Sequence, residues 1–286
     1  MKYDYIRAQT AHYPIEMMCR LLGVSRSGFY DFCRRPKSAH QLHDDHLKPL
    51  SSEMFYEYKE RYGVIRLWKE FRTRGIPCGR DRLRRLMREL DLVAKATRTR
   101  APRTTRSDHE EPVSPNLLMR HFDVTQRDTV WLADISYLGT KQGWVYLACV
   151  MDLYSRRIVG WTVRESLARQ GTLDALEVAL GNRRPEAGLI HHSDRGVQYA
   201  SKDYKKRLLE AGARQSMSRK GDCWDNAPME SFFGRMKQEL DVMLFESKEA
   251  AAQAVFKYIE LFYNPKRAHS SLNYLSPVAF ETQYAA

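Results

Sequence analysis

The chain has 286 residues, 43% of them apolar and 29% charged, a composition that indicates a globular protein of about two domains and excludes a collagen, a disordered tail or a disulfide-stabilised miniprotein. Its formal net charge of +12 indicates a polyanionic partner, either nucleic acid or an anionic membrane. Residues 1–106 hold 24 of the 47 Lys and Arg residues but only 12 of the 35 Asp and Glu residues. All of the excess positive charge therefore lies in the first part of the chain.

Cysteine usage and apolar runs narrow the cellular setting. The five cysteines are scattered and contain no CxxC pair, which argues against a disulfide framework and a cysteine-rich zinc site. The N-terminal residues lack the apolar stretch of a signal peptide, and the longest apolar run, residues 145–151, is much shorter than the ~20 residues of a membrane span. We expect a cytoplasmic protein with no membrane partner.

Residues 13–35 are predicted to form two short helices around a tight turn. Apolar residues recur at helical spacing before Gly23, and Ser25 is a suitable N-cap for the helix that follows. This is the outline of a helix-turn-helix, whose second helix commonly enters the major groove of DNA. Arg26, Ser27 and Tyr30 on that helix are one predicted DNA-contacting set.

A second helix-turn-helix pattern is predicted between residues 63 and 92. The side of its second helix that lies opposite the apolar face carries Arg82, Arg85 and Arg88, flanked by Arg80 and Arg84. A balanced mixture of charges would indicate only a solvated helix face. Residues 80–106 instead hold ten basic and three acidic residues, which favours contact with phosphates. These arginines are the alternative DNA-contacting set.

Proline, threonine, serine and charged residues without apolar periodicity then predict a linker over residues 95–118. The predicted domains are therefore a helix-turn-helix-like segment over 1–42, a second helix-turn-helix-like domain over 43–94, the linker, and a third domain over 119–286.

The third domain is predicted to be a mixed α/β sheet covered by helices. Alternating runs rich in Val, Ile, Trp and Tyr predict an antiparallel meander of three strands, followed by two more strands that are separated by helices. The predicted strands are 129–138, 144–152, 156–163, 189–192 and 214–218, and the predicted helices are 172–180, 201–211, 227–241 and 248–263.

Three carboxylates stand out because of where this scaffold places them. Asp134 lies within the first strand, where burying a carboxylate without a partner is costly. Asp194 follows the fourth strand, at the end where ligands bind in α/β sheets, and Glu230 lies early in a helix, 35 residues further on. Singly, each could be a surface ion pair or a helix cap. As a set, they indicate a two-metal site for phosphoryl transfer, because magnesium prefers oxygen ligands.

The helix that carries Glu230 also carries Lys237, two turns further along. A cation there could hold a nucleic-acid backbone, and Gly234 between the two residues would leave room for it. A solvated lysine beside a helix-packing glycine is an equally good interpretation.

Four motifs resemble OrfB transposases of the insertion-sequence-three family. They are residues 131–137, residues 192–199, residues 225–233 with Lys237 and Glu239, and residues 263–267 with 269–272. Residues 62–92 also resemble the helix-turn-helix-like domain that precedes the catalytic core in this family, so the resemblance covers nearly the whole chain.

The resemblance implies a ribonuclease-H-like core, similar to that of retroviral integrases, with a DD(35)E triad. Asp134, Asp194 and Glu230 would hold two Mg²⁺ ions, for which Mn²⁺ could substitute, and Lys237 would contact DNA. The implied reaction is cleavage at the 3′ ends of an insertion sequence followed by strand transfer. We also expect Arg195 to contact DNA, and Trp224 either to stack on a flipped base or simply to pack.

The implied partners are double-stranded DNA, both the terminal inverted repeats and the target, and a second copy of the chain, since two ends need two catalytic sites. The protein would then be associated with the nucleoid. Family members are often fused to an OrfA part that has a leucine zipper, and no heptad run is present here, so an OrfA partner is expected. Two alternatives remain: a non-catalytic DNA-binding regulator, and a ribonuclease-H-like nuclease that cuts without joining.

Overall fold

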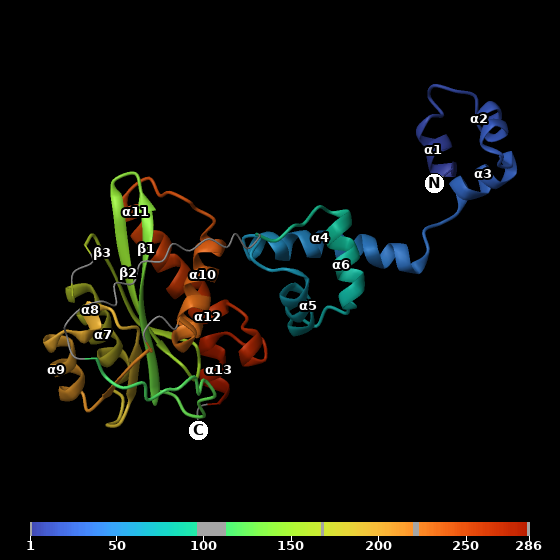
Figure 1. The fold of residues 1–286 in the computed structure, drawn as a ribbon. Helices are drawn as coiled ribbons and strands as arrows, with labels where there is room; N and C mark the ends of the chain where they lie inside the picture. The colour runs from blue at the N-terminus through green and yellow to red at the C-terminus, as the bar shows by residue number, and fades with distance from the viewer. Residues whose placement is uncertain (1, 96–112, 167–168, 220–222, 285–286) are drawn as a thin grey trace. The chain divides into compact units, whose positions relative to one another are not determined.

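The computed structural model describes residues 2–95, 113–166, 169–219 and 223–284 (Figure 1). The chain divides into two compact units, Met1–Leu92 and Val93–Ala286. No described helix is long and apolar enough to cross a membrane.

The first unit begins with three short helices, α1 (Lys2–Ala8), α2 (Ile15–Leu22) and α3 (Arg26–Arg34). Helices α2 and α3 confirm the predicted pair: Gly23 ends α2 in the left-handed conformation, and the Ser25 hydroxyl accepts a hydrogen bond from the Gly28 N–H at 3.0 Å. The small core that joins the three helices consists of Ile6, Met18, Cys19 and Phe29.

The same unit continues with α4 (Ala39–Glu57), α5 (Val64–Thr73) and α6 (Arg80–Glu89). Helices α5 and α6 were predicted, and their buried residues include Leu67, Phe71, Leu83, Leu86 and Met87. Helix α4 was not predicted, because its buried face includes the polar residues Asp44 and Ser51 and its interior contains Pro49. Its start is fixed by a capping box between Ser38 and Gln41.

The second unit contains a five-stranded mixed sheet, as predicted, and its strands lie in the order β3-β2-β1-β4-β5. Strands β1 (Val130–Thr140), β2 (Gly143–Asp152) and β3 (Ile158–Arg164) form the antiparallel meander. Strands β4 (Ile190–Ser193) and β5 (Arg214–Met217) run parallel to β1. Ala133 and Ser193 are the last residues that β1 and β4 pair with each other, so the parallel ladder between these two strands ends there.

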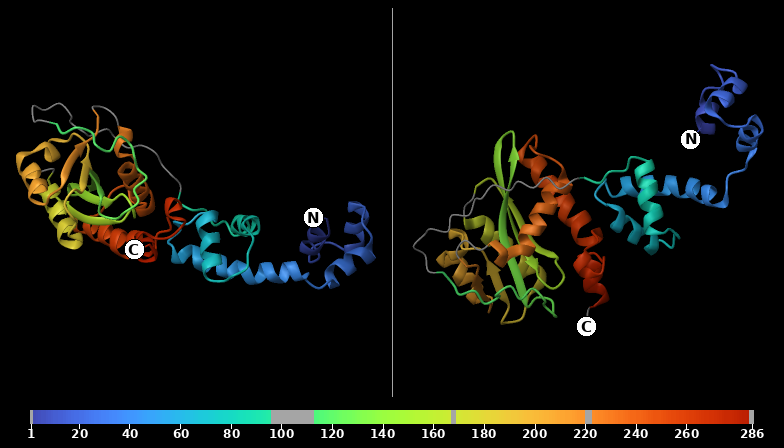
Figure 2. Two further views of the ribbon diagram at one scale, coloured as in Figure 1. Left: turned by 90° about the horizontal axis from the view of Figure 1, so that it is seen from below. Right: turned by 45° about the vertical axis from the view of Figure 1, so that its right-hand side comes forward.

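Helices cover both faces of this sheet (Figures 1 and 2). One face packs on α7 (Arg169–Arg183), α8 (Val197–Ala200) and α9 (Lys202–Glu210), through a core that includes Trp131, Val150, Leu176, Tyr204 and Leu208. Helix α7 approaches β3 so closely at Gly160 that a Cβ there would lie 2.3 Å from the Ala175 carbonyl oxygen.

The other face carries α10 (Ala227–Leu240) and α11 (Lys248–Tyr258), which contact β1 and β2. Helix α11 continues through a π-helical turn (Ile259–Tyr263) into α12 (Asn264–Lys266), and α13 (Pro277–Gln283), which was not predicted, follows.

The predicted linker requires one correction. Residues 113–118 were expected in it but bind to β5: the Ser114 hydroxyl donates to Gln215 Oε1 at 2.6 Å, and the Leu117 N–H donates to Ser216 Oγ at 2.8 Å. Because these groups bond to side chains of β5, residues 113–118 belong to the second unit. Residues 96–112 of the predicted linker lie outside the described part of the chain.

Candidate active site and DNA-binding surfaces

Asp134 and Asp194 lie directly after the last paired residues of two neighbouring parallel strands, Ala133 of β1 and Ser193 of β4. The Ile135 N–H donates to Asp134 Oδ1 at 2.8 Å, and the Gly196 N–H donates to Asp194 Oδ1 at 2.9 Å. Because parallel strands end at one edge of a sheet, the fold brings two carboxylates that are 60 residues apart to adjacent positions.

Glu230 lies in the first turn of α10, which packs against β1. The helix buries a stripe of apolar residues at helical spacing, Met229, Phe232, Phe233 and Met236. Glu230 itself is exposed, so α10 is anchored by its apolar side and presents this carboxylate to solvent.

The three carboxylates influence one another electrostatically. Burial raises the pKa of Asp134 well above its usual value, and the negative charges of Asp194 and Glu230 raise it further. The positive charge of Lys237 opposes this shift. Burial also raises the pKa of Glu230. Since charges act on one another in this way only at short range, the predicted triad and Lys237 occupy one region of the second unit.

This region has the donor chemistry for a divalent cation. Carboxylate oxygens are the ligands that Mg²⁺ prefers, and a cation would offset the repulsion that raises the Asp134 pKa. Within the described residues, however, no group of three or more His, Cys, Asp or Glu side chains is arranged to hold a metal ion. The carboxylates are therefore neighbours that do not form a closed ligand shell by themselves.

Lys237 lies between the acidic region and an aromatic side chain. Its ammonium nitrogen is 4.6 Å from the centre of the Tyr137 ring, a cation–π distance. Burial lowers the pKa of Lys237, and the charge of Asp134 opposes that shift. A Cβ at Gly234 would meet nothing within 4 Å. Helix packing therefore does not require a glycine there, which favours the interpretation that this surface leaves room for a ligand.

Asp225 fixes the segment just before α10. Its side chain is fully buried and accepts hydrogen bonds from Arg120 Nε and Arg219 Nη2, both at 2.9 Å, and from Asn116 Nδ2 at 2.9 Å. The hydrogen bonds from Arg219 outweigh burial and hold the pKa of this carboxyl far below its usual value. Asp225 lies in the motif at residues 225–233, but no role was predicted for it.

The far end of α10 is held by a second buried carboxylate, Glu239. Arg267 donates to it from Nη2 at 2.7 Å and from Nε at 2.9 Å, and the Tyr258 hydroxyl donates to Glu239 Oε2 at 2.9 Å. Glu239 and Arg267 are each only 3% exposed. Glu239 and Arg267 also belong to the quoted motifs, so motif membership was the signal that could have identified this pair.

Arg195 and Trp224, which were also predicted to contact DNA, differ in the surroundings of their side chains. Arg195 donates from Nε to the Ser218 carbonyl oxygen at 2.6 Å and thereby ties the end of β4 to the end of β5. Trp224 is 66% exposed, in the short 3₁₀ helix before α10. Its exposure makes the indole accessible to a ligand, whereas Arg195 has a structural contact.

Helix α3 presents its predicted set to solvent. Arg26, Ser27 and Tyr30 are all exposed, and Arg26 pairs with Glu16 at 3.3 Å. These three side chains are therefore available for DNA.

Two members of the predicted trio of Arg82, Arg85 and Arg88 also contact α4, although 42% of the Arg85 side chain remains exposed. Arg82 hydrogen-bonds His43 Nδ1 at 2.7 Å, and Arg85 donates to the buried Asp44 at 2.7 Å, so both connect α6 to α4. Arg88 is exposed, as are Arg80 and Arg84. At a spacing of four residues, these three form a stripe on the exposed side of the helix.

We predict that this stripe contacts phosphates. Replacing Arg80, Arg84 and Arg88 together by glutamine should weaken DNA binding and reduce its salt slope by about 2.7, since each lost phosphate contact removes about 0.9. The measurement is the dissociation constant between about 50 and 200 mM salt. The control is Arg82→Gln with Arg85→Gln, which should lower stability and leave the slope unchanged. A flattened slope in the control alone would instead assign the phosphate contacts to Arg82 and Arg85.

Two buried histidines precede Asp194. The His191 ring nitrogen Nε2 lies 3.1 Å from the Tyr204 hydroxyl, and the His192 ring nitrogens lie 2.8 Å and 3.2 Å from the Ser216 and Ser218 hydroxyls. Burial lowers the pKa of His191 to about 3 and that of His192 to about 4. Both rings are therefore neutral packing groups at neutral pH.

These shifts predict acid sensitivity. A histidine whose folded pKa lies below its unfolded value of about 6.5 stabilises the fold above that pH and loses this contribution as the pH falls toward the folded pKa. The free energy of unfolding should therefore fall by about 1.4 kcal/mol per pH unit for each histidine as the pH drops from 6 to 4.5. Urea unfolding of the wild type and of His192→Gln across this range tests the prediction, and equal slopes would contradict it.

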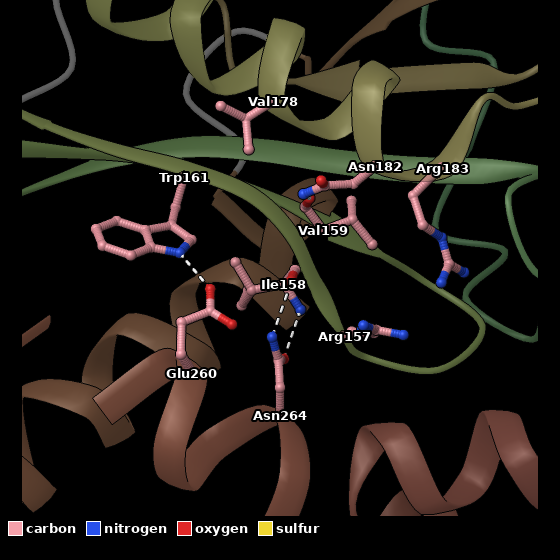
Figure 3. A pocket seen from close by; sticks show the side chains of 9 residues that line it. All are labelled: Arg157, Ile158, Val159, Trp161, Val178, Asn182, Arg183, Glu260 and Asn264. Atoms are coloured by element: carbon pink, nitrogen blue, oxygen red, sulfur yellow. Dashed lines mark hydrogen bonds between the residues drawn. The ribbon is translucent and has the colours of Figure 1, made fainter. Parts of the chain in front are cut away.

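A pocket at the edge strand β3 contains none of the predicted site residues (Figure 3). Asn264 brackets the backbone of Ile158 there: its Oδ1 accepts from the Ile158 N–H and its Nδ2 donates to the Ile158 carbonyl, both at 3.0 Å. Trp161 donates to Glu260 at 2.7 Å. These hydrogen bonds satisfy polar groups of the edge strand β3, so Asn264 and Glu260 have structural roles in the pocket.

Comparisons with known proteins agree with this architecture. Two models described as an integrase core domain match residues 124–223 and 211–277, and a model described as an HTH-like domain matches residues 43–100. The sheet and helices α7 to α12 thus lie within the residues matched by the integrase core models, and the HTH-like model covers α5, α6 and α4 from residue 43 onward.

Two curated proteins are similar over nearly their whole length. The chain is 44% identical to the insertion element IS600 uncharacterized 31 kDa protein of Shigella sonnei, over 93% of this chain and 98% of that one. It is 41% identical to transposase InsF for insertion sequence IS3A of Escherichia coli K12, over 100% of both chains.

Among solved structures, the magnesium complex of the HTLV-2 integrase catalytic core domain is 15% identical, covers 54% of this chain and 96% of that one, and has a TM-score of 0.40, a level on which no conclusion rests. Full-length identity above 40% is decisive by itself. The chain belongs to the IS3 family of insertion-sequence transposases, polynucleotidyl transferases that carry an integrase core domain behind an HTH-like domain.

Proposed function

We propose that the protein cuts DNA at the ends of its own insertion sequence and joins the resulting 3′ ends to target DNA. The observation that carries this proposal is geometric: the register of β1 and β4 places Asp134 beside Asp194, and α10, which bears Glu230 and Lys237, packs against β1. A cluster of carboxylates beside a single lysine suits phosphoryl transfer, because the reaction needs both a divalent cation and compensation for the phosphate charge.

Asp134, Asp194 and Glu230 are the residues that would hold Mg²⁺ or Mn²⁺, two ions in each site. When bound, the ions would supply charge stabilisation for the oxygens that attack and leave the phosphorus. Helix α10, strand β1 and the end of β4 are regular elements, so each carboxylate has a defined position.

The remaining groups orient DNA. Lys237 would contact the phosphate backbone beside the reacting phosphodiester, and the open surface at Gly234 would admit the backbone. The α3 and α6 surfaces of the first unit would bind the terminal repeats, and Trp224 would stack on an unpaired base.

Two displacement steps complete the reaction. The oxygen of a water molecule forms a bond to phosphorus, the bond to the 3′ oxygen breaks, and that oxygen takes a proton and leaves as a 3′ hydroxyl. This hydroxyl then forms a bond to a phosphorus atom of the target, loses its proton, and displaces another 3′ oxygen.

Because two ends must react, we propose a dimer or larger assembly on DNA, together with an OrfA partner.

The test is to incubate the protein with DNA from its own element ends and Mg²⁺ and to map the nicks and joints. We expect nicks at the element termini and joints to a labelled target. Precut ends should join to the target without prior cleavage. Cutting without joining would indicate the nuclease alternative, and neither reaction with intact end binding would indicate a DNA-binding regulator.

A further inference from the structure

Asn226 lies where the two aspartate-bearing strands separate. Its amide nitrogen Nδ2 donates to the Ala133 carbonyl oxygen at 3.2 Å, and Ala133 is the last residue of β1 that pairs with β4. Beyond this point β4 no longer accompanies β1, so the amide binds β1 where the ladder ends. Asp134 is the next residue of β1, and Asp194 is the next residue after β4.

The same side chain stands directly before α10. Although Asn226 occupies the N-cap position, its side chain makes no capping hydrogen bond to the helix. Its amide connects instead to β1, four residues before Glu230 and one residue before Asp134. Asp225, held by Arg120 and Arg219, fixes the backbone on its other side. One hydrogen bond therefore links the strand that bears the first carboxylate to the helix that bears the third.

The other half of this amide is unsatisfied. Asn226 is 4% exposed, and its Oδ1 has no hydrogen-bond partner within the described residues. A buried acceptor without a partner is costly and rare in folded proteins, so it requires an explanation. Asn264 provides the comparison: it is 5% exposed, but both of its amide atoms are bonded to Ile158.

We propose that Asn226 is a positioning residue of the catalytic centre: its amide nitrogen sets the spacing between Asp134 and Glu230, and its oxygen is a neutral acceptor for the hydrated divalent cation. This inference rests on the proposed metal-dependent function. An amide suits the position because it both donates to the Ala133 carbonyl and accepts on its other side. An aspartate would lose the donor and add a negative charge to a region where Asp134 already experiences two others.

The experiment measures metal binding directly, without DNA or catalysis. Full-length protein is titrated with Mn²⁺, and free Mn²⁺ is followed by electron paramagnetic resonance. We expect Asn226→Ala to weaken Mn²⁺ binding by about 10-fold or more, the effect of removing a group that orients metal ligands. Asn226→Ser, which keeps a shorter polar group, should fold even if the alanine variant does not, and it should show the same direction of change.

Asn264→Ala is the matched control, because it removes an equally buried amide that bonds to the backbone of the edge strand β3. We expect it to lower the melting temperature while leaving the Mn²⁺ dissociation constant within about twofold of the wild type. Equal weakening by both alanine variants, or no weakening by either Asn226 variant, would overturn the positioning role. Absence of saturable binding by the wild type would instead overturn the proposed metal site.

Discussion

Replacing Glu230 by glutamine should abolish both DNA cleavage and strand transfer in Mg²⁺ while leaving binding to the element ends within a few-fold of wild type. The substitution keeps the size of the side chain but removes its negative charge, and Mg²⁺ binds carboxylate oxygens in preference to neutral groups. Because Glu230 is exposed in the first turn of α10 and its helix is anchored by the opposite side, folding should be unaffected. The measurements are nicking and joining of labelled ends, with a mobility-shift assay for binding.

Glu260 provides the matched control. It is also an exposed glutamate in a helical segment, but its carboxylate accepts a hydrogen bond from Trp161 of the edge strand β3 (Figure 3). Glu260→Gln should leave cleavage and joining unchanged. Strand transfer retained by Glu230→Gln would remove this residue from the catalytic set and leave only Asp134 and Asp194 as candidates.

The positions of the three carboxylates could be predicted because each follows from a local pattern. Alternating apolar residues predict β1 and β4, the stripe of Met and Phe residues predicts α10, and the parallel pairing of strands places Asp134 beside Asp194. The antiparallel meander and the two parallel strands likewise follow from periodicity and from the helices between them.

The partners of buried charges could not be predicted, because they are distant in sequence. Asp225 meets Arg120 across 105 residues, and Arg85 meets Asp44 across 41. Without the unpredicted helix α4, nothing in the sequence distinguishes Arg82 and Arg85, which bind that helix, from Arg88, which is exposed. Charge alone thus identified the basic helix but could not identify which of its sides faces solvent.

The pair formed by Glu239 and Arg267 is the strongest example of such a distant contact. It joins the end of α10 to a segment 28 residues further along the chain, with both side chains nearly inaccessible to water. Desolvating two charges offsets much of their attraction, so the pair adds less net stability than its geometry indicates. Removing one partner is different, because the remaining charge stays buried and uncompensated.

Arg267→Met should therefore lower the free energy of unfolding of the second unit by about 3–5 kcal/mol. Glu239 would lose the guanidinium that neutralises its buried charge, whereas the Tyr258 hydroxyl, which also donates to it, carries no charge. In the double variant Glu239→Leu, Arg267→Met, no charge is left behind, and well-packed apolar residues at a buried ion pair are often neutral or stabilising. The double variant should thus be more stable than the single variant. Urea unfolding followed by tryptophan fluorescence measures both effects.

An exposed ion pair provides the comparison for the predicted effect of Arg267→Met. Lys141 and Glu246 are 2.6 Å apart, but 58% and 77% of their side chains are exposed, so Lys141→Met should cost less than about 1 kcal/mol. If Arg267→Met were equally mild, water must reach Glu239, and the end of α10 would not be held by a buried charge pair. If the double variant were as unstable as the single one, the loss would come from the packing of the Arg267 stem instead of the uncompensated carboxylate. The difference between the single and double variants therefore separates electrostatics from packing at the helix that carries Glu230.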